Sequence, residues 1–218
     1  MLYKEPHFRV LGDRGLLIEF GNSINRETKE RLSAMETIIA QRKIDGVIET
    51  IPGYCSLSIL FDPLKLCFED LVNKVKDLSQ CLSNTALEKP RTVKVPVVYG
   101  RKIGPDLEFV AKFHNLTPAE VIRIHSSVTY TVYVMGTTGF AYLGDLPEEL
   151  HTPRLETPRS SVPAGSIGIG NNQTGIYAVE GPSGWQWIGK TSLQIYDPSK
   201  EFPVLLRPND NVLFTPVE

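Results

Sequence analysis

The chain changes character at Thr129, and this change constrains the fold more than any other feature of the sequence. From there the segments TYTVYVM, GSIGIG, TGIYAV, WQWIG, LQIYDP and NVLFTPV follow one another. Gly and Pro separate them at intervals of about ten residues, a spacing typical of short strands in all-β units. No helical period of any length appears among them. Short strands at this spacing predict a closed or nearly closed β-barrel.

The first part of the chain alternates between the periods of strands and helices. A strand, a helix with an apolar stripe, two strands, a second amphipathic helix and a last strand are predicted in that order. This β-α-β-β-α-β order is typical of the split βαβ, or ferredoxin-like, arrangement with two helices on one face of an antiparallel sheet. The predicted segments cover residues 14–20, 25–43, 46–53, 54–63, 68–82 and 91–99.

Between the two parts lies NTALEKPR, residues 84–91, a polar and proline-bearing stretch that we interpret as a boundary. The fold class is therefore α+β, with a ferredoxin-like domain over residues 1–88 and a barrel domain over 89–218. Two short helices are predicted after the boundary, the second with Thr117 and Glu120 in a capping box. His114 and His125 lie in this helical region without acidic neighbours at ligand spacing, which favours satisfied or surface histidines over a metal site.

Composition narrows the classes of function. Of the 218 residues 22% are charged and the net charge is −2, which argues against nonspecific nucleic-acid binding because that needs a concentrated basic surface. No apolar run is long enough to cross a bilayer, and the N-terminus has charges where a signal peptide needs an apolar core. We expect a cytoplasmic protein. Cys55, Cys67 and Cys81 are widely spaced and lack metal-ligand spacing, so free thiols and no metal are expected.

The stretch PRLETPRSSVPAGSIGIGNNQTGIY, which begins at Pro153, is the first candidate for a binding site. Each proline stiffens the backbone beside an arginine, Arg154 or Arg159. A pre-positioned guanidinium suits a carboxylate or a phosphate because its fork binds two oxygens at once. One arginine can bind a ligand while the other holds a structural carboxylate; the alternative is that both are surface arginines in a stiff loop.

Other polar and aromatic residues nearby allow two interpretations each. Gln173 and Thr174 can orient a polar ligand or bond to their own turn. Trp185 and Trp187 point the same way from a strand, as a pocket wall or as core. His151 can act as a general acid or base if it faces the cleft, and otherwise is an exposed histidine at a helix end. The glycines match neither a P-loop nor a dinucleotide site, and no hydrolase G-x-S-x-G is present.

Three segments of the second half, PRLETPRSSVPAGSIGIGNNQTGIY, GPSGWQWIGKTSLQIYDP and LLRPNDNVLFTPV, strongly resemble the KipI / allophanate hydrolase subunit 1 family, which includes PxpB of the 5-oxoprolinases. LGDRGLLIEFG and TPAEVIRIHSSVTYTVYVMG resemble it as well, so the resemblance covers nearly the whole chain. It implies a cyclophilin-like β-barrel after a small α+β domain. It also implies a partner of the KipA, or PxpC, type and a PxpA-like third subunit, and ATP used by the complex through another subunit, with no cofactor bound by this chain.

The resemblance carries to individual positions. Gly136–Gly144 departs from the family's Gly-Phe-x-Pro-Gly-Phe loop by lacking the proline and one residue, which bears on substrate more than on fold. Lys190 stands where the family often has Arg. The positions implied to bind substrate are Phe140, Arg154, Arg159, Gln173, Thr174, Gly175, Tyr177, Trp185 and Lys190.

The resemblance implies a subunit of an ATP-dependent hydrolase that converts 5-oxo-L-proline to L-glutamate and is inactive alone. In that reading Arg159 holds the substrate carboxylate, Gln173 and Thr174 position the lactam, and His151 is the catalytic candidate. The first alternative is a KipI-type inhibitor of a sensor histidine kinase. The second is a carboxyltransferase or allophanate hydrolase subunit of urea metabolism, ranked last because the chain has no biotin attachment motif.

Overall fold

The structure, a computed structural model, describes residues 1–80, 90–136 and 138–218. Spatial contacts divide the chain into two compact units, Met1–Lys89 and Pro90–Glu218, and each is described by itself. Cys81, the end of the second predicted helix and most of the predicted boundary segment lie outside the described residues.

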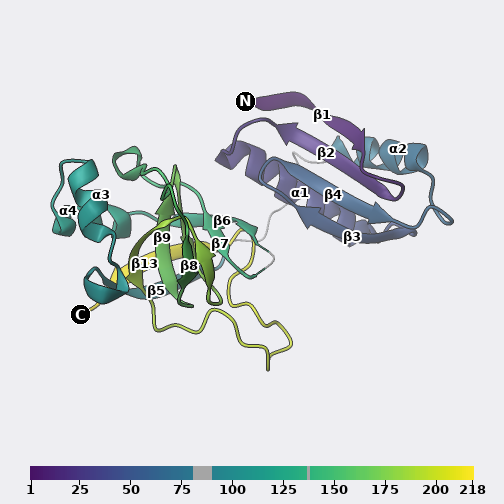
Figure 1. Ribbon diagram of the computed structural model, residues 1–218. Helices are drawn as coiled ribbons and strands as arrows, with labels where there is room; N and C mark the ends of the chain where they lie inside the picture. Colours follow the sequence, from purple (N-terminus) through teal and green to yellow (C-terminus); the bar gives the residue numbers. More distant parts are fainter. Residues whose placement is uncertain (81–89, 137) are drawn as a thin grey trace. The chain divides into compact units, whose positions relative to one another are not determined.

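The first unit is a four-stranded antiparallel sheet with two helices on one face (Figure 1). The strands lie in the order β1-β2-β4-β3. Apolar residues alternate along the two central strands, so that one face of each strand enters the core beneath the helices. The elements in chain order are β1 Leu2–Val10, β2 Gly15–Gly21, α1 Arg26–Arg42, β3 Val47–Pro52, β4 Ser56–Phe61 and α2 Phe68–Ser79.

Helix α1 begins and buries its apolar stripe as the sequence predicts. The side chain of Asn25 caps it by accepting a hydrogen bond from the backbone N–H of Thr28 at 2.9 Å. This bond satisfies one of the donors that a helix leaves unpaired at its start. Leu32 and Met35 are fully buried against the sheet, beside Ile39.

One strand of the predicted sheet is exchanged for another. The segment predicted as its last strand is β5, Thr92–Tyr99, and pairs within the second unit with β12 and β13. Its place beside β2 is taken by β1, which forms a hairpin with β2 around Gly12, at φ 66°. Strand β1 escapes the sequence pattern because most of its residues are exposed. The split βαβ arrangement is thus kept with an N-terminal edge strand in place of a C-terminal one.

The second unit contains a closed seven-stranded barrel, in the order β10-β7-β6-β13-β5-β12-β9. This confirms the predicted class, a small α+β unit followed by a β-barrel. A separate two-stranded sheet of β8 and β11 accompanies the barrel. The further strands are β6 Tyr130–Met135, β7 Ala141–Leu143, β8 Arg159–Val162, β9 Ser166–Gly170, β10 Gln173–Ile176, β11 Gly181–Ser183, β12 Gln186–Lys190 and β13 Asn211–Pro216.

Alternate residues of the barrel strands fill its interior. Ile167 and Ile169 of β9 are fully buried in one core with Ile176 of β10 and Ile188 of β12. Gly168 and Gly170 alternate with these isoleucines and face the opposite side of β9. LQIYDP, predicted as a strand, is instead part of the connection to β13, where Tyr196 forms only an isolated bridge with Val204.

Two predicted helices, α3 Leu107–Phe113 and α4 Pro118–Ser126, lie together beside the barrel (Figure 1). The capping box of α4 is confirmed: the Thr117 hydroxyl accepts from the N–H of Glu120, and the Glu120 carboxylate accepts from the N–H of Thr117. The cap starts α4 at a fixed residue. It therefore sets which residue of the last turn, His125, enters the core.

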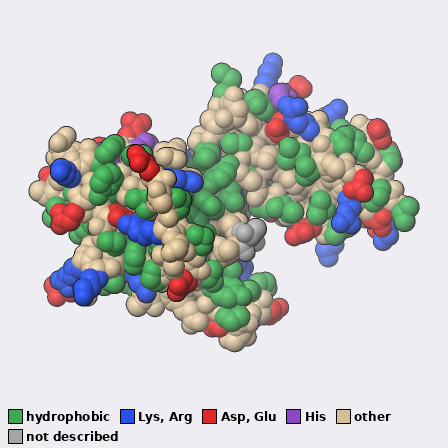
Figure 2. Space-filling view, viewed as in Figure 1, with side chains coloured by type: hydrophobic (Ala, Val, Ile, Leu, Met, Phe, Trp, Pro, Cys, Tyr) green, Lys and Arg blue, Asp and Glu red, His purple; other side chains and the backbone are tan. Residues whose placement is uncertain are grey.

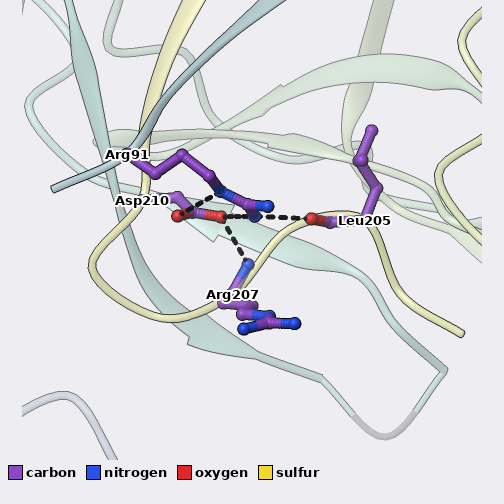
Figure 3. A network of polar contacts seen from close by, with 4 residues as sticks. All are labelled: Arg91, Leu205, Arg207 and Asp210. Carbon is purple, nitrogen blue, oxygen red and sulfur yellow. Dashed lines mark hydrogen bonds and ion pairs between the residues drawn. The ribbon is translucent and has the colours of Figure 1, made fainter. Parts of the chain in front are cut away.

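A buried carboxylate fixes the place where the chain enters the barrel (Figure 3). Asp210 accepts hydrogen bonds from Arg91 Nε at 3.1 Å and from the N–H of Arg207 at 2.8 Å. Arg91 Nη2 also donates to the carbonyl of Leu205 at 2.7 Å. Arg91 directly precedes β5 and Asp210 directly precedes β13, the two strands that pair in parallel. The network therefore stabilises the start of that long-range pairing.

Lys and Arg side chains are interspersed with Asp and Glu over the face seen in Figure 2. Among the described residues, no helix is long and apolar enough to span a membrane.

Candidate functional site

The backbone around Arg154 is tied to the start of β12 on both sides. The carbonyl of Pro153 accepts from Gln186 Nε2 at 2.8 Å, and the N–H of Leu155 donates to the carbonyl of Gly184 at 2.6 Å. Pro153 restricts its own φ as well. The segment is irregular yet held in one place, as the two Pro-Arg dipeptides predict.

The Arg154 side chain is exposed and lies over an aromatic ring. Its guanidinium carbon is 5.2 Å from the ring centroid of Trp185, within the range of a cation–π contact. Arg154 forms no ion pair or hydrogen bond through its guanidinium within residues 1–80, 90–136 and 138–218. Its N–H donors are therefore available to solvent, on a backbone that is held on both sides.

Beneath Arg154 lies a buried aromatic cluster, formed by Phe140, Tyr177 and Trp185 with Val162 and flanked by Tyr142. Phe140 is at the centre, with ring centroids 4.6 Å from Tyr177 and 5.1 Å from Trp185 in edge-to-face contacts. Such contacts stabilise aromatic pairs beyond the area they bury. The cluster brings together three of the residues implied to bind substrate and places Arg154 over one of them.

Glycines of β9 and β10 leave room for the aromatic rings of this cluster. A Cβ on Gly170 would lie 2.6 Å from the Trp185 ring, and one on Gly175 would lie 2.3 Å from the ring of Phe140. These glycines face the aromatic rings rather than a free ligand surface, because their neighbours Ile169 and Ile176 fill the barrel interior. The small residues after the Pro-Arg pair thus let aromatic rings lie against the strands.

The altered loop at Gly136 presents Phe140 to this cluster. The N–H of Gly139 donates to the carbonyl of Gly136 at 2.8 Å, and the N–H of Gly136 donates to the carbonyl of Phe140 at 2.8 Å. Gly139 has φ 74°, a conformation that favours glycine. These two bonds close the turn between Gly136 and Phe140; Thr137 lies outside the described residues.

We predict that Gly175→Ala destabilises the barrel unit by about 2 kcal/mol, because the added methyl group overpacks the aromatic cluster. Its nearest backbone atom is the carbonyl oxygen of Ala141 at 2.8 Å, which cannot move aside without disturbing β7. Urea denaturation followed by tryptophan fluorescence measures the loss. Gly181→Ala is the matched control, since a Cβ at Gly181 meets no atom within 4 Å. Equal stability of the two variants would contradict the prediction.

Two hydroxyl groups close the cluster near Arg154. The Tyr177 hydroxyl forms a short hydrogen bond with Ser183 Oγ, which also accepts from the N–H of Trp185 at 3.0 Å. Burial raises the pKa of Tyr177, while the hydrogen bond with Ser183 and the positive charge of Arg154 oppose the rise. Tyr177 therefore stays protonated at neutral pH and acts as a neutral hydroxyl.

Arg159, the second arginine, holds a structural carboxylate. Its Nη2 donates to Asp106 Oδ1 at 2.6 Å, and Asp106 Oδ2 accepts from the N–H of Trp187 at 2.6 Å. The other terminal nitrogen of Arg159, Nη1, is buried and has no hydrogen-bond partner among the described residues. Arg159 is thus paired with a carboxylate, whereas Arg154 has no ion pair among the described residues. This matches the first of the two arrangements expected from the sequence, with Asp106 as the structural carboxylate. The assignment of Arg159 to the substrate carboxylate stays a prediction.

Thr174 lies away from Arg154, inside the barrel. Its hydroxyl donates to the carbonyl of Gly168 at 3.0 Å and bonds to His125 Nε2 at 2.9 Å. Because the hydroxyl proton is used on the carbonyl, His125 Nε2 is the donor, and His125 Nδ1 accepts from Tyr99 at 2.8 Å. His125 is thus a satisfied core histidine, as predicted. The Thr174 hydroxyl donates its proton within the barrel, and its role in positioning a lactam stays a prediction.

The remaining predicted residues are Gln173, His151 and Lys190. Gln173 is buried at the start of β10. His151 ends a short 3-10 helix, Glu148–Leu150, and its Nε2 donates to the carbonyl of Leu146 at 3.0 Å. Lys190 lines a different, open depression of about 410 Å³ beside Thr191 and Tyr196. Neither His151 nor Lys190 contacts the aromatic cluster through a described hydrogen bond or ring contact.

The described residues contain no group of three or more His, Cys, Asp or Glu side chains that could hold a metal ion. Sequence reasoning missed Asp106, because nothing in the residues around it marks a buried carboxylate. Asp106 sits at the N-cap of α3 without capping it through its side chain. Its partners Arg159 and Trp187 are far away in sequence, so no local pattern could have identified it.

The comparisons with known proteins identify the class. A family model described as carboxyltransferase domain, subdomain C and D, matches residues 6–206, and the chain belongs to this family. Within it, the chain is 40% identical over 211 residues to a protein of Escherichia coli O157:H7 named as a 5-oxoprolinase subunit, covering 95% of this chain and 94% of the relative. It is 38% identical over 215 residues to the protein of the same name from Bacillus subtilis, covering 94% and 90%.

More distant relatives include the urea amidolyase of Lachancea kluyveri, 25% identical over 96% of this chain but only 13% of that protein. Among solved structures, TTHA0988 matches with a TM-score of 0.82 and 33% identity over 94% of this chain; the chain spans 40% of that longer protein. PH0987 from Pyrococcus horikoshii matches with a TM-score of 0.58 and 40% identity, covering 97% of this chain and 98% of that one.

Proposed function

We propose that this chain is the non-ATP-binding subunit of an ATP-dependent 5-oxoprolinase. The observation that carries the proposal is the match to two proteins named as 5-oxoprolinase subunits, each at about two-fifths identity and each over at least nine-tenths of both chains. Both matches therefore include the α+β unit as well as the barrel unit. The urea amidolyase relative is less similar and is mostly composed of other segments, which ranks a role in urea metabolism lower.

The chemistry of the reaction explains why such a chain would work in a complex. A lactam is a stable amide, and its carbonyl must be activated before water can open the ring. ATP supplies that activation, yet the sequence has no phosphate-binding P-loop. We therefore place ATP on another subunit and propose PxpC-like and PxpA-like partners. This chain would contribute part of the substrate cleft, which the partner completes.

A deletion strain tests this function in the cell. A strain of the source organism that lacks this chain should accumulate 5-oxoproline several-fold, and the plasmid-borne wild-type chain should restore the normal level. Extracted metabolites provide the measurement. An unchanged 5-oxoproline level, together with inhibition of a sensor kinase's autophosphorylation by the purified chain, would replace the proposal with the kinase-inhibitor alternative.

A further inference from the structure

Arg154 combines three properties, and it differs from Arg207, which lies over the exposed ring of Phe202, because the ring beneath Arg154 is the buried Trp185. The backbone of Arg154 is tied on both sides by the bonds of Pro153 and Leu155. Its guanidinium lies over Trp185. It has no acidic partner in the part of the chain that the structure describes, whereas Arg91 and Arg159 are each paired with an aspartate. A fixed, exposed and unpaired guanidinium loses little conformational freedom on binding an anion.

The surroundings of Arg154 suit a flat ligand with one carboxylate. The guanidinium is exposed above the Trp185 ring, and its fork can donate to two oxygens of a carboxylate. The Tyr177–Ser183 hydroxyl pair lies below as a neutral polar group. No acidic side chain of the described residues is paired to Arg154, so an incoming carboxylate does not have to displace an ion pair among them.

We propose that Arg154 binds the carboxylate of the substrate, held against Trp185, and that Arg159 only positions the strand that follows. This inference rests on the proposed function for the identity of the substrate, 5-oxoproline. It rests on the contacts of Arg154 alone for the class of ligand, a small carboxylate. It gives the carboxylate to Arg154 instead of Arg159, because Arg159 Nη2 is bonded to Asp106 and Arg159 Nη1 is buried.

Steady-state kinetics of the assembled complex test the proposal. Arg154→Ala should raise the KM for 5-oxoproline about ten- to hundredfold, the range expected for loss of a hydrogen-bonded charge pair. Turnover of 2-pyrrolidinone, the same lactam without the carboxylate, should be equal in wild type and variant. Arg154→Lys should fall between them, since it keeps the charge but not the fork. Arg123→Ala, at an exposed arginine of α4, is the matched control.

Three outcomes would overturn this assignment while leaving the proposed function intact. The first is an unchanged KM in Arg154→Ala. The second is an equal loss with 5-oxoproline and 2-pyrrolidinone, which would make Arg154 a scaffold residue. The third is failure of Arg154→Ala to assemble in size-exclusion chromatography, which would show that the arginine binds an acidic side chain of another subunit.

A binding measurement keeps the inference testable if the wild-type complex does not turn over 5-oxoproline at all. The chain has two tryptophans, and Trp187→Phe leaves Trp185 as the only one. Titration of the complex with 5-oxoproline, without ATP, should give a saturable change in tryptophan fluorescence that is absent with 2-pyrrolidinone and absent in Arg154→Ala. A wild-type complex that shows no such change overturns the carboxylate site, whatever reaction the complex catalyses.

Discussion

Replacement of Asp106 with alanine is expected to lower the free energy of unfolding of the barrel unit by about 3 kcal/mol, the lower end of the range for breaking a buried ion pair. Asp106 accepts two hydrogen bonds of 2.6 Å, from Arg159 Nη2 and from the N–H of Trp187. Its loss leaves both donors unsatisfied in a largely buried place. Because both tryptophans lie in this unit, urea denaturation followed by tryptophan fluorescence reports on the unit directly.

Two further variants distinguish the stability lost with the ion pair from a nonspecific loss of stability. Glu108→Ala removes an exposed acid of the same helix and should change stability by less than about 0.5 kcal/mol. Adding Arg159→Ala to Asp106→Ala should recover part of the loss, since no unpaired guanidinium then remains. If the loss in the double variant equals or exceeds the sum of the two single losses, Asp106 and Arg159 do not act as a pair.

Acidification should destabilise the barrel unit through His125. Burial lowers the pKa of His125 to about 3 from its ordinary value of 6.5. Between these two values the unfolded chain binds a proton on this side chain and the folded chain does not. The free energy of unfolding therefore falls as the pH falls through this window, by up to about 1.4 kcal/mol per pH unit from this group alone. Below the window both states are protonated and the contribution stops changing.

Urea denaturation at pH 7, 5 and 4 measures this dependence as a difference between variants. His125→Gln should be less stable than wild type at pH 7, because the imidazole stacks on Phe214 and bonds to Tyr99 and Thr174. Its stability should nonetheless fall less steeply with acid. His7→Gln, at an exposed histidine of β1, should keep the wild-type slope. A wild-type slope in His125→Gln would show that other groups cause the acid sensitivity.

Local patterns predicted much of the fold because the relevant interactions are themselves local. The caps at Asn25 and Thr117 depend on residues within one helical turn, and the apolar stripe of α1 depends on helical spacing. The choice of sheet for β5 was not predictable in this way. Its partner β13 lies more than a hundred residues further along the chain, and β-type residues suit either sheet equally well.

The candidate site, too, could be predicted from the sequence only where its features depend on neighbouring residues. The stiff backbone around Arg154 follows from Pro153, and the sequence predicts it correctly. The sequence does not reveal which arginine is free, because the answer depends on Asp106, which reaches Arg159 only in the folded barrel. Gly175 was implied to approach a ligand. A glycine that makes room for a ring, here Phe140, and one that makes room for a ligand have the same sequence pattern.

Glutamate formation by the reconstituted complex tests the central claim most directly. This chain would be purified with the PxpC-like and PxpA-like subunits of its source organism and assayed with 5-oxoproline and ATP. The account predicts glutamate release that requires ATP, requires every subunit and is absent with this chain alone. Release of glutamate by this chain alone, or its absence from a fully assembled complex supplied with ATP, would contradict the account.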